Sequence, residues 1–137
     1  MLYGQEHVDR YVATDGEEGY LWRDAPTLIL TTTGRKSGEQ RSTPLIFGTH
    51  GNDYLIVGSK GGNPTAPSWY VNLQANPEVQ VQVKGDRFKA HARTATDTEK
   101  PELWKIMTGV WPDYDSYQQR TARVIPVVII TRDLACR

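Results

Sequence analysis

Three segments carry side chains that could bind an anion or a flat organic molecule. The first spans residues 33–41 (TGRKSGEQR), where Arg35, Lys36 and Arg41 are opposed only by Glu39. Its two glycines let backbone N–H groups approach an anion closely. A solvated turn of a β protein would have the same composition, so this segment alone leaves both interpretations open.

The second segment spans residues 58–64 (GSKGGNP) and combines a lysine, a hydroxyl group and three glycines. These groups can present hydrogen-bond donors to a phosphate or a carboxylate. The alternative is a flexible connection between a strand and a helix. The sequence therefore offers a second candidate for anion binding.

The third segment, residues 111–117 (WPDYDSY), places Trp111, Tyr114 and Tyr117 three residues apart. Pro112 suits the first turn of a helix, and this spacing gathers the three rings on one side of it. They could form a wall for a flat ligand, with the phenol hydroxyls as polar groups. On pattern alone, such a stripe is more often part of a hydrophobic core.

The usual catalytic motifs are absent from the chain. It has no GxSxG, GxxxxGK[ST], GxGxxG or HExxH sequence. Three separated histidines and the single Cys136 offer no metal-ligand spacing and no disulfide within one chain. An enzyme with so few acid–base groups would take its chemistry from a bound cofactor.

Size and charge narrow the class of protein. The 137 residues (15.5 kDa) fit one domain, and 16 basic residues balance 16 acidic ones. A nucleic-acid-binding protein would normally show a basic excess. No apolar run reaches membrane-spanning length, and the first residues carry charges where a signal peptide is apolar. We expect a soluble cytoplasmic protein.

Alternating β-branched and apolar residues predict six strands, with tight turns at 50–52 and 85–86. The predicted strands are Thr27–Thr33, Ser42–Thr49, Asp53–Ser59, Val79–Lys84, Arg87–Thr94 and Val124–Thr131. Helices are predicted near the N-terminus, at Ser68–Ala75 and at about 99–110. For the last helix we favour Thr98 over Thr96 as the capping residue, because Pro101 then falls in the first turn.

This order of elements predicts a mainly β (α+β) fold, a six-stranded antiparallel split β-barrel with short flanking helices. Pro44 and Pro126 fall inside strand-like runs and indicate edges or bulges where the barrel is split. We expect residues 1–26 to form an N-terminal helical extension and residues 27–137 to form the barrel domain.

The stretch from Leu28 to Thr131 resembles the deazaflavin (coenzyme F420)-dependent nitroreductase family. The matching phrases are LILTTTGRKSGEQRSTPL, VGSKGGNPTAPSWYVNLQANPEVQVQVKG, ARTATDTE, WPDYDSYQQRT and IPVVIITR. The resemblance implies a fold related to the FMN-binding split barrel. It also implies the deazaflavin coenzyme, whose tail carries a phosphate and several glutamyl carboxylates, with FMN as the alternative cofactor.

The resemblance assigns roles to individual residues. It places the coenzyme against Arg35, Lys36, Ser37, Gly38, Gln40, Arg41, Pro44, Ser59, Lys60, Gly61, Gly62, Trp69 and Asn72. It places the substrate against Ile46, Trp111, Tyr114 and Tyr117. Family members that reduce nitroimidazoles carry a tyrosine in place of Trp111 and another aromatic near Ile46, so the substrate wall differs here.

The implied reaction is hydride transfer from the reduced deazaflavin to an activated double bond of an enone, lactone or quinone, with nitroaromatics as further candidates. Tyr114, Tyr117 and Ser59 are the expected catalytic residues, although solvent could also deliver the proton. A non-catalytic carrier of the deazaflavin or FMN, or a structural domain, would explain many of the same residues. A homodimer is consistent with a split barrel.

Overall fold

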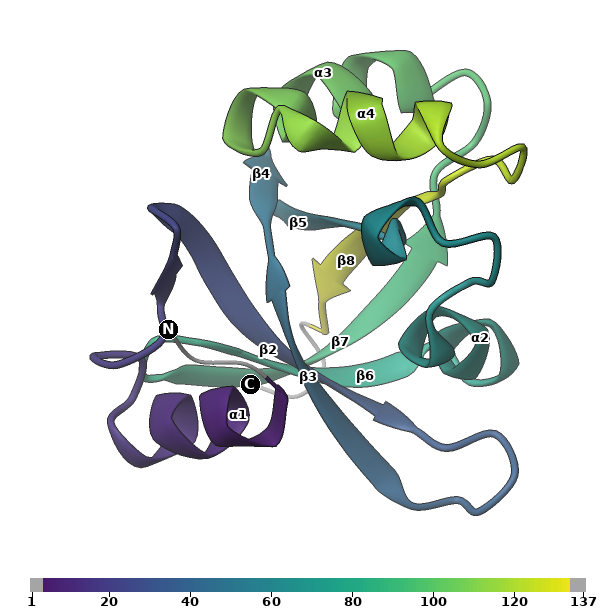
Figure 1. Ribbon diagram of the computed structural model, residues 1–137. Helices are drawn as coiled ribbons and strands as arrows, with labels where there is room; N and C mark the ends of the chain where they lie inside the picture. Colours follow the sequence, from purple (N-terminus) through teal and green to yellow (C-terminus); the bar gives the residue numbers. More distant parts are fainter. Residues whose placement is uncertain (1–3, 134–137) are drawn as a thin grey trace.

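The computed structural model describes residues 4–133, so Cys136 lies outside the described residues. Its centre is an antiparallel sheet whose strands follow the order β1-β2-β6-β7-β8-β5-β4, with β3 paired to β2 (Figure 1). The strands are β1 (Leu21–Trp22), β2 (Ala25–Thr33), β3 (Gln40–Ile46), β4 (Gly48–His50), β5 (Asp53–Val57), β6 (Glu78–Val83), β7 (Asp86–Thr94) and β8 (Val127–Arg132). The mainly β half-barrel with short helices confirms the predicted fold class.

The predicted strand Ser42–Thr49 is divided in two. β3 pairs with β2 as far as Ile46, and after Phe47 the chain continues as β4 and pairs with β5. Phe47 is buried, and its N–H donates to the Pro26 carbonyl at 3.0 Å, outside either strand. This change of partner is the split in the barrel. Together with the short β1, it raises the number of strands to eight instead of six.

The two prolines lie where the ladder does not need their missing N–H. Pro44 is on β3, which pairs with β2 alone, so the prediction of an edge position is confirmed. Pro126 immediately precedes β8, which begins at Val127 and not at the predicted Val124. The predicted turns at 50–52 and 85–86 do connect β4 with β5 and β6 with β7.

The two larger clusters of buried residues lie on opposite faces of β5. Ile56 of β5 faces the barrel interior, where it packs with Leu28, Leu30 and further residues of β6, β7 and β8. Its neighbours Leu55 and Val57 face the other way because side chains alternate along a strand. They pack against α3 (Lys100–Val110) and α4 (Asp113–Gln119), which lie at the top in Figure 1.

The N-terminal helix α1 (Gly4–Ala13) lies against the sheet. Tyr11 is completely buried and packs with Ile29. Its hydroxyl donates to the Thr27 carbonyl at 2.9 Å and accepts from the Lys84 N–H at 2.7 Å. These two bonds join α1 to β2 and to the β6–β7 turn. The division of the chain at residues 26 and 27 stays a prediction, and β2 begins at Ala25.

Among residues 4–133, no helix has the length and apolar character needed to cross a membrane.

The helix α2 (Ser68–Ala75) is confirmed at its predicted bounds and buries Trp69 and Leu73. It ends before Asn76–Pro77, as expected for residues preceding a proline.

The start of α3 corrects the preference for Thr98 as its cap. The Glu99 N–H donates to the Thr96 hydroxyl at 3.2 Å, and the Thr96 N–H donates to the Glu99 carboxylate at 3.0 Å. This reciprocal pair is a capping box that starts one turn earlier, ahead of the helix. Pro101 still falls in the first turn of α3 because Thr96–Glu99 forms a separate turn before it.

Hydrogen bonds from Arg93, then from Thr96, lower the pKa of Glu99 from its usual 4.5 to about 2. The charged carboxylate therefore stabilises the fold above about pH 4.5, and this contribution is lost as the pH falls toward 2. We expect Glu99→Gln, which can still cap Thr96, to flatten the fall in melting temperature between about pH 6 and pH 2.5. Glu102→Gln, in the first turn of α3, is the control. Equal acid sensitivity in Glu99→Gln and the native chain would contradict the prediction.

Candidate active site

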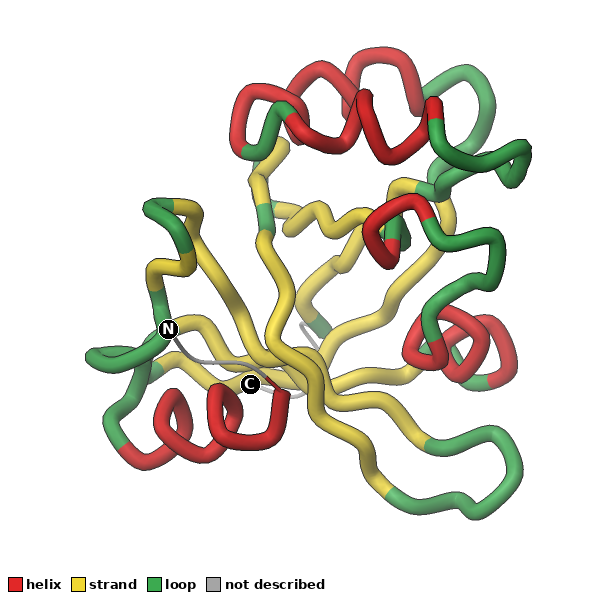
Figure 2. The backbone as a smooth tube through the Cα atoms, in the orientation of Figure 1, coloured by secondary structure: helices red, strands yellow, loops and turns green. Residues whose placement is uncertain are grey.

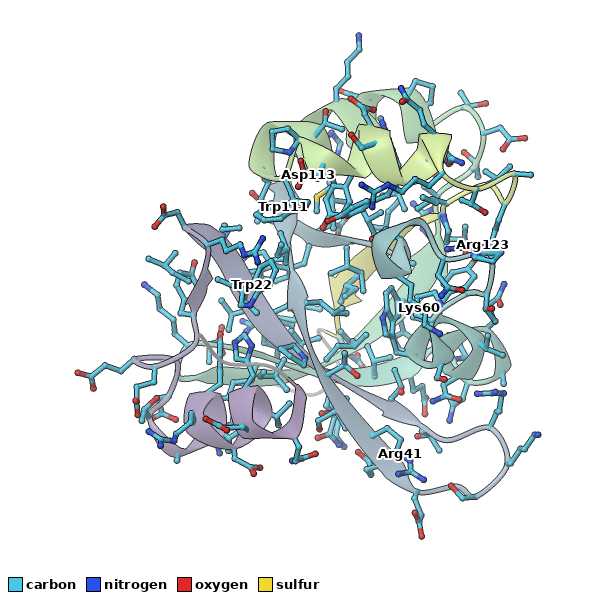
Figure 3. All side chains as sticks on the ribbon, viewed as in Figure 1. Trp22, Arg41, Lys60, Trp111, Asp113 and Arg123 are labelled. Carbon is cyan, nitrogen blue, oxygen red and sulfur yellow. The ribbon has the colours of Figure 1, made fainter. Side chains whose placement is uncertain are left out.

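A pocket of about 500 Å³ opens between the edge of the barrel and the helices above it. It is lined by Gly4, His7, Trp22, Thr27, Thr43, Pro44, Leu45, Ile46, Val57, Ser59, Lys60, Pro67, Ser68, Trp69, Trp111, Tyr114 and Tyr117. Figure 3 shows Trp22 and Trp111 on one side and Lys60 across from them. Predicted coenzyme and substrate residues thus meet in one cavity with flat aromatic walls.

A second groove, of about 650 Å³, lies beside the loop between β2 and β3. Figure 2 shows this loop extending beyond the sheet at the lower right. The groove is lined by Gln5, Gly34, Arg35, Lys36, Ser37, Gln40, Arg41, Ser42, Thr43, Ser68, Trp69 and Asn72. Its three cations, Arg35, Lys36 and Arg41, would suit a ligand with several negative charges.

The two cavities are neighbours. Thr43, Ser68 and Trp69 line both of them. The strand β3 runs along both, with its first residues beside the groove and its last residues, to Ile46, beside the pocket. One long ligand with a flat head and an anionic tail could therefore occupy pocket and groove together.

Asn72 lies in the groove and holds the basic loop. It is almost fully buried, and its Oδ1 accepts from the Arg35 N–H at 3.2 Å and from Arg35 Nη1 at 2.8 Å. Its Nδ2 donates to the Thr32 hydroxyl at 3.3 Å. Of the predicted coenzyme residues, Pro44 and Trp69 line the pocket, whereas Asn72 lines only the groove.

Some predicted coenzyme residues shape the backbone instead of lining a cavity. Gly38 turns the basic loop with a φ of +73° and lines neither the pocket nor the groove. Gly61 and Gly62 belong to a single 3-10 turn, η1 (Lys60–Gly62). A Cβ on Gly62, whose φ is +81°, would lie 2.6 Å from the Tyr117 carbonyl oxygen. Glycine there lets the turn lie directly against α4.

The aromatic stripe belongs to both core and pocket. Tyr114 is 5% exposed and packs in the layer beneath α3, yet it also lines the pocket. Trp111 and Tyr117 are half-buried, and the indole Nε1–H of Trp111 donates to the Tyr117 hydroxyl at 3.3 Å. Both interpretations left open by the spacing therefore apply, and Trp111 lies at the end of α3, ahead of the short helix α4 that carries Tyr114 and Tyr117.

The hydroxyls of Tyr114 and Tyr117 are available to a ligand. Burial raises the pKa of Tyr114, so its hydroxyl stays protonated at neutral pH. Within residues 4–133, every fully buried side-chain polar atom has a hydrogen-bond partner, whereas the Tyr114 hydroxyl has none. The hydroxyl is thus not fully enclosed by protein. It therefore faces the pocket. Because Tyr117 accepts a bond from Trp111, its own proton can point to another acceptor.

Sequence reasoning missed three residues around the pocket. Trp22 of β1 lines it, and its ring centroid lies 5.4 Å from that of Trp111. His7 of α1 also lines it and bonds the Gly19 carbonyl through Nε2 at 2.7 Å. Arg123 lies behind the Ser59 loop. A tryptophan next to a two-residue turn was the available signal for Trp22, whereas no motif marks Arg123.

A sequence profile of F420H(2)-dependent quinone reductases matches residues 3–132. The chain belongs to this family. It is 43% identical over 130 residues to an F420H(2)-dependent quinone reductase of Mycobacterium tuberculosis, covering 92% of this chain and 87% of that one. It is accordingly an oxidoreductase that uses reduced coenzyme F420.

Solved structures agree with the family and the fold. A structure described as an F420-H2-dependent reductase (FDR-A) is 42% identical, with a TM-score of 0.71 over 77% of this chain and 93% of that one. A second, described as a domain-swapped dimer, is 38% identical, with a TM-score of 0.74 over 92% of this chain and 95% of that one. The finer relation to nitroreductases stays a prediction.

Proposed function

We propose that this protein transfers a hydride from reduced coenzyme F420 to a quinone bound between the coenzyme and the aromatic wall. The observation that carries the proposal is the continuity of a basic groove with an aromatic pocket. The name of the 43% identical relative supports a quinone as the acceptor. A quinone is flat and apolar, with two carbonyl oxygens, which fits a pocket walled by rings and supplied with hydroxyl groups.

The residues present fit the coenzyme. Arg35, Lys36 and Arg41 would hold its anionic tail in the groove, and Lys60 would reach the phosphate from the pocket side. Pro44 and Trp69 would contact the ring system. When bound, the reduced deazaflavin supplies the hydride, so the protein needs no redox group of its own.

The protein's own contribution is alignment and hydrogen bonding at the substrate oxygens. Trp111, Trp22 and Ile46 would hold the quinone ring flat and exclude water. The Tyr114 and Tyr117 hydroxyls would donate to the carbonyl oxygens, where negative charge develops as hydride arrives. Ser59, which lines the same pocket, is a third donor.

A direct assay tests this function. Purified protein would be mixed with reduced coenzyme F420 and menadione, and the return of oxidised coenzyme followed by its absorbance. Reduction of menadione faster than of cyclohexenone, an unsaturated lactone or a nitroaromatic would support the proposal. Preferential reduction of cyclohexenone, the lactone or the nitroaromatic would identify that class of compound, and not a quinone, as the substrate. Bound coenzyme without turnover of any acceptor would favour a carrier, and tighter binding of FMN would refute the coenzyme assignment.

The basic groove makes its own prediction. We expect Lys36→Ala combined with Arg41→Ala to weaken coenzyme binding roughly tenfold and to make binding less sensitive to salt. The melting temperature should hardly change, since exposed charges contribute only about 0–1 kcal/mol to folding. Fluorescence titration at two salt concentrations measures the affinity.

A double variant with equal loss of charge, Arg10→Ala with Lys105→Ala, serves as the control because both side chains are exposed and outside the two cavities. Native affinity in a folded Lys36/Arg41 variant would show that the coenzyme tail does not bind in this groove.

A homodimer also remains a prediction for this chain, supported by the relative described as a domain-swapped dimer.

A further inference from the structure

The loop that carries Ser59 and Lys60 has an unusual backbone. Lys60 and Gly62 both adopt the left-handed region, with φ values of +45° and +81°. Within the loop, the Gly62 N–H donates to the Ser59 carbonyl at 2.9 Å and the Asn63 N–H donates to the Lys60 carbonyl at 3.1 Å. A lysine in this region is strained, and such residues persist only where the surroundings fix them.

The fixing group is the guanidinium of Arg123. Its Nη1 donates to the Gly58 carbonyl at 3.1 Å, and its Nη2 donates to the Ser59 carbonyl at 3.0 Å and the Asn63 carbonyl at 3.1 Å. Its Nε donates to Asn63 as well, at 3.2 Å. One planar fork thus holds carbonyls from both ends of the loop, which a lysine ammonium cannot reproduce. Figure 3 shows Arg123 beside the loop that carries Lys60.

Arg123 is itself held from α4. Gln118 Nε2 donates to the Arg123 carbonyl at 2.8 Å, while its Oε1 accepts from the Ile125 N–H at 2.8 Å. Gln118 follows Tyr117, which lines the pocket. Hydrogen bonds therefore run without interruption from the aromatic helix through Gln118 and Arg123 to the coenzyme loop.

We propose that Arg123 is a positioning residue, held in place by Gln118, that fixes Ser59 and Lys60 in the arrangement that binds the coenzyme. This inference rests on the proposed function of the pocket. Arg123 is not placed as a direct ligand of the coenzyme, because it lines neither the pocket nor the groove and four of its five N–H donors are used on backbone carbonyls. It acts through the loop.

Fluorescence titration of the protein with coenzyme F420 tests the proposal. We expect Arg123→Lys to raise the dissociation constant about tenfold, since the lysine keeps the charge but loses the fork. Arg87→Lys is the matched control, because Arg87 also donates to a backbone carbonyl, that of Val12, but lies away from the pocket. Its coenzyme affinity should stay within about twofold of the native value.

Gln118→Glu provides a milder second variant, which keeps the acceptor for Ile125 and removes the donor to Arg123. We expect it to weaken coenzyme binding roughly threefold and to add little in combination with Arg123→Lys, because the two residues act as one unit. In steady-state kinetics of both variants, KM for the coenzyme should rise while KM for the quinone stays constant.

The outcomes separate the two proposals. A native protein that binds no coenzyme F420 would overturn the proposed function and this inference together. Native binding with unchanged affinity in folded Arg123→Lys and Gln118→Glu would overturn this inference alone. A lower melting temperature with unchanged affinity would reduce Arg123 to a structural role, and equal rises in both KM values would do the same. Should Arg123→Lys fail to fold, the result for Gln118→Glu decides.

Discussion

Gly62→Ala is expected to weaken coenzyme binding by more than tenfold. The new Cβ would lie 2.6 Å from the Tyr117 carbonyl oxygen and 3.1 Å from the Tyr117 Cα, both backbone atoms that cannot easily yield. Alanine at a φ of +81° also costs about 1–2 kcal/mol. The turn must therefore move away from α4 and take Lys60 with it. Titration with the coenzyme measures the result.

The matched control for this variant is Gly51→Ala. Gly51 lies in the β4–β5 turn with a φ of +62°, and nothing lies within 4 Å of the position of its Cβ. It therefore shares the backbone strain without the collision. Gly51→Ala should lose some stability and keep its coenzyme affinity. If both variants bind the coenzyme equally well, the contact between η1 and α4 is unimportant for the site.

Tyr114→Ala is expected to destabilise the fold by about 3–5 kcal/mol, because a large side chain that is only 5% exposed leaves a cavity. Its ring centroid lies 6.3 Å from that of Trp104 and 6.1 Å from that of Tyr117, so both neighbours lose packing. Tyr117→Phe, in contrast, keeps its ring and should leave the melting temperature nearly unchanged. Chemical denaturation of both variants measures these differences.

Loss of either tyrosine hydroxyl should lower the rate of catalysis without unfolding the protein. Tyr117→Phe removes a donor to the substrate oxygen and should lower kcat for menadione roughly tenfold with coenzyme affinity preserved. Tyr114→Phe keeps the packing and removes the other proposed donor, so it should lower kcat as well. Native kcat in both phenylalanine variants would assign the proton to solvent. Severe unfolding of Tyr117→Phe would instead show that its hydroxyl, which accepts from Trp111, is needed for the fold.

Local signals in the sequence were sufficient for most of the fold. Glycine-containing turns at 50–52 and 85–86 fix two hairpins, and the Asn76–Pro77 pair ends α2, since each depends on residues close in sequence. The break at Phe47 was not predictable in this way. It depends on a bond to Pro26, which lies 21 residues earlier, and on the pairing of β4 with β5.

The same distinction applies to the site. The basic loop and the aromatic stripe are short motifs, and the structure does place them in adjoining cavities. Arg123 was missed because its partners lie 60 to 65 residues away and are backbone carbonyls, which any sequence supplies. Trp22 was missed because its role follows from β1 pairing with β2 opposite Ala25, which brings its ring to Trp111.

Because β3 runs beside both cavities, an insertion or deletion has different consequences in this strand and in the loop that precedes it. The loop of residues 34–39 lies outside the β2–β3 ladder, so insertions there would lengthen this loop and leave the pocket wall in place. A single codon lost within Gln40–Ile46 would shift every later residue of the strand to the opposite face. Coenzyme and substrate contacts would then be lost together. A change of length in the loop should therefore alter the contacts of Arg35 and Lys36 with the coenzyme tail, whereas one in the strand alters the tail and ring contacts together.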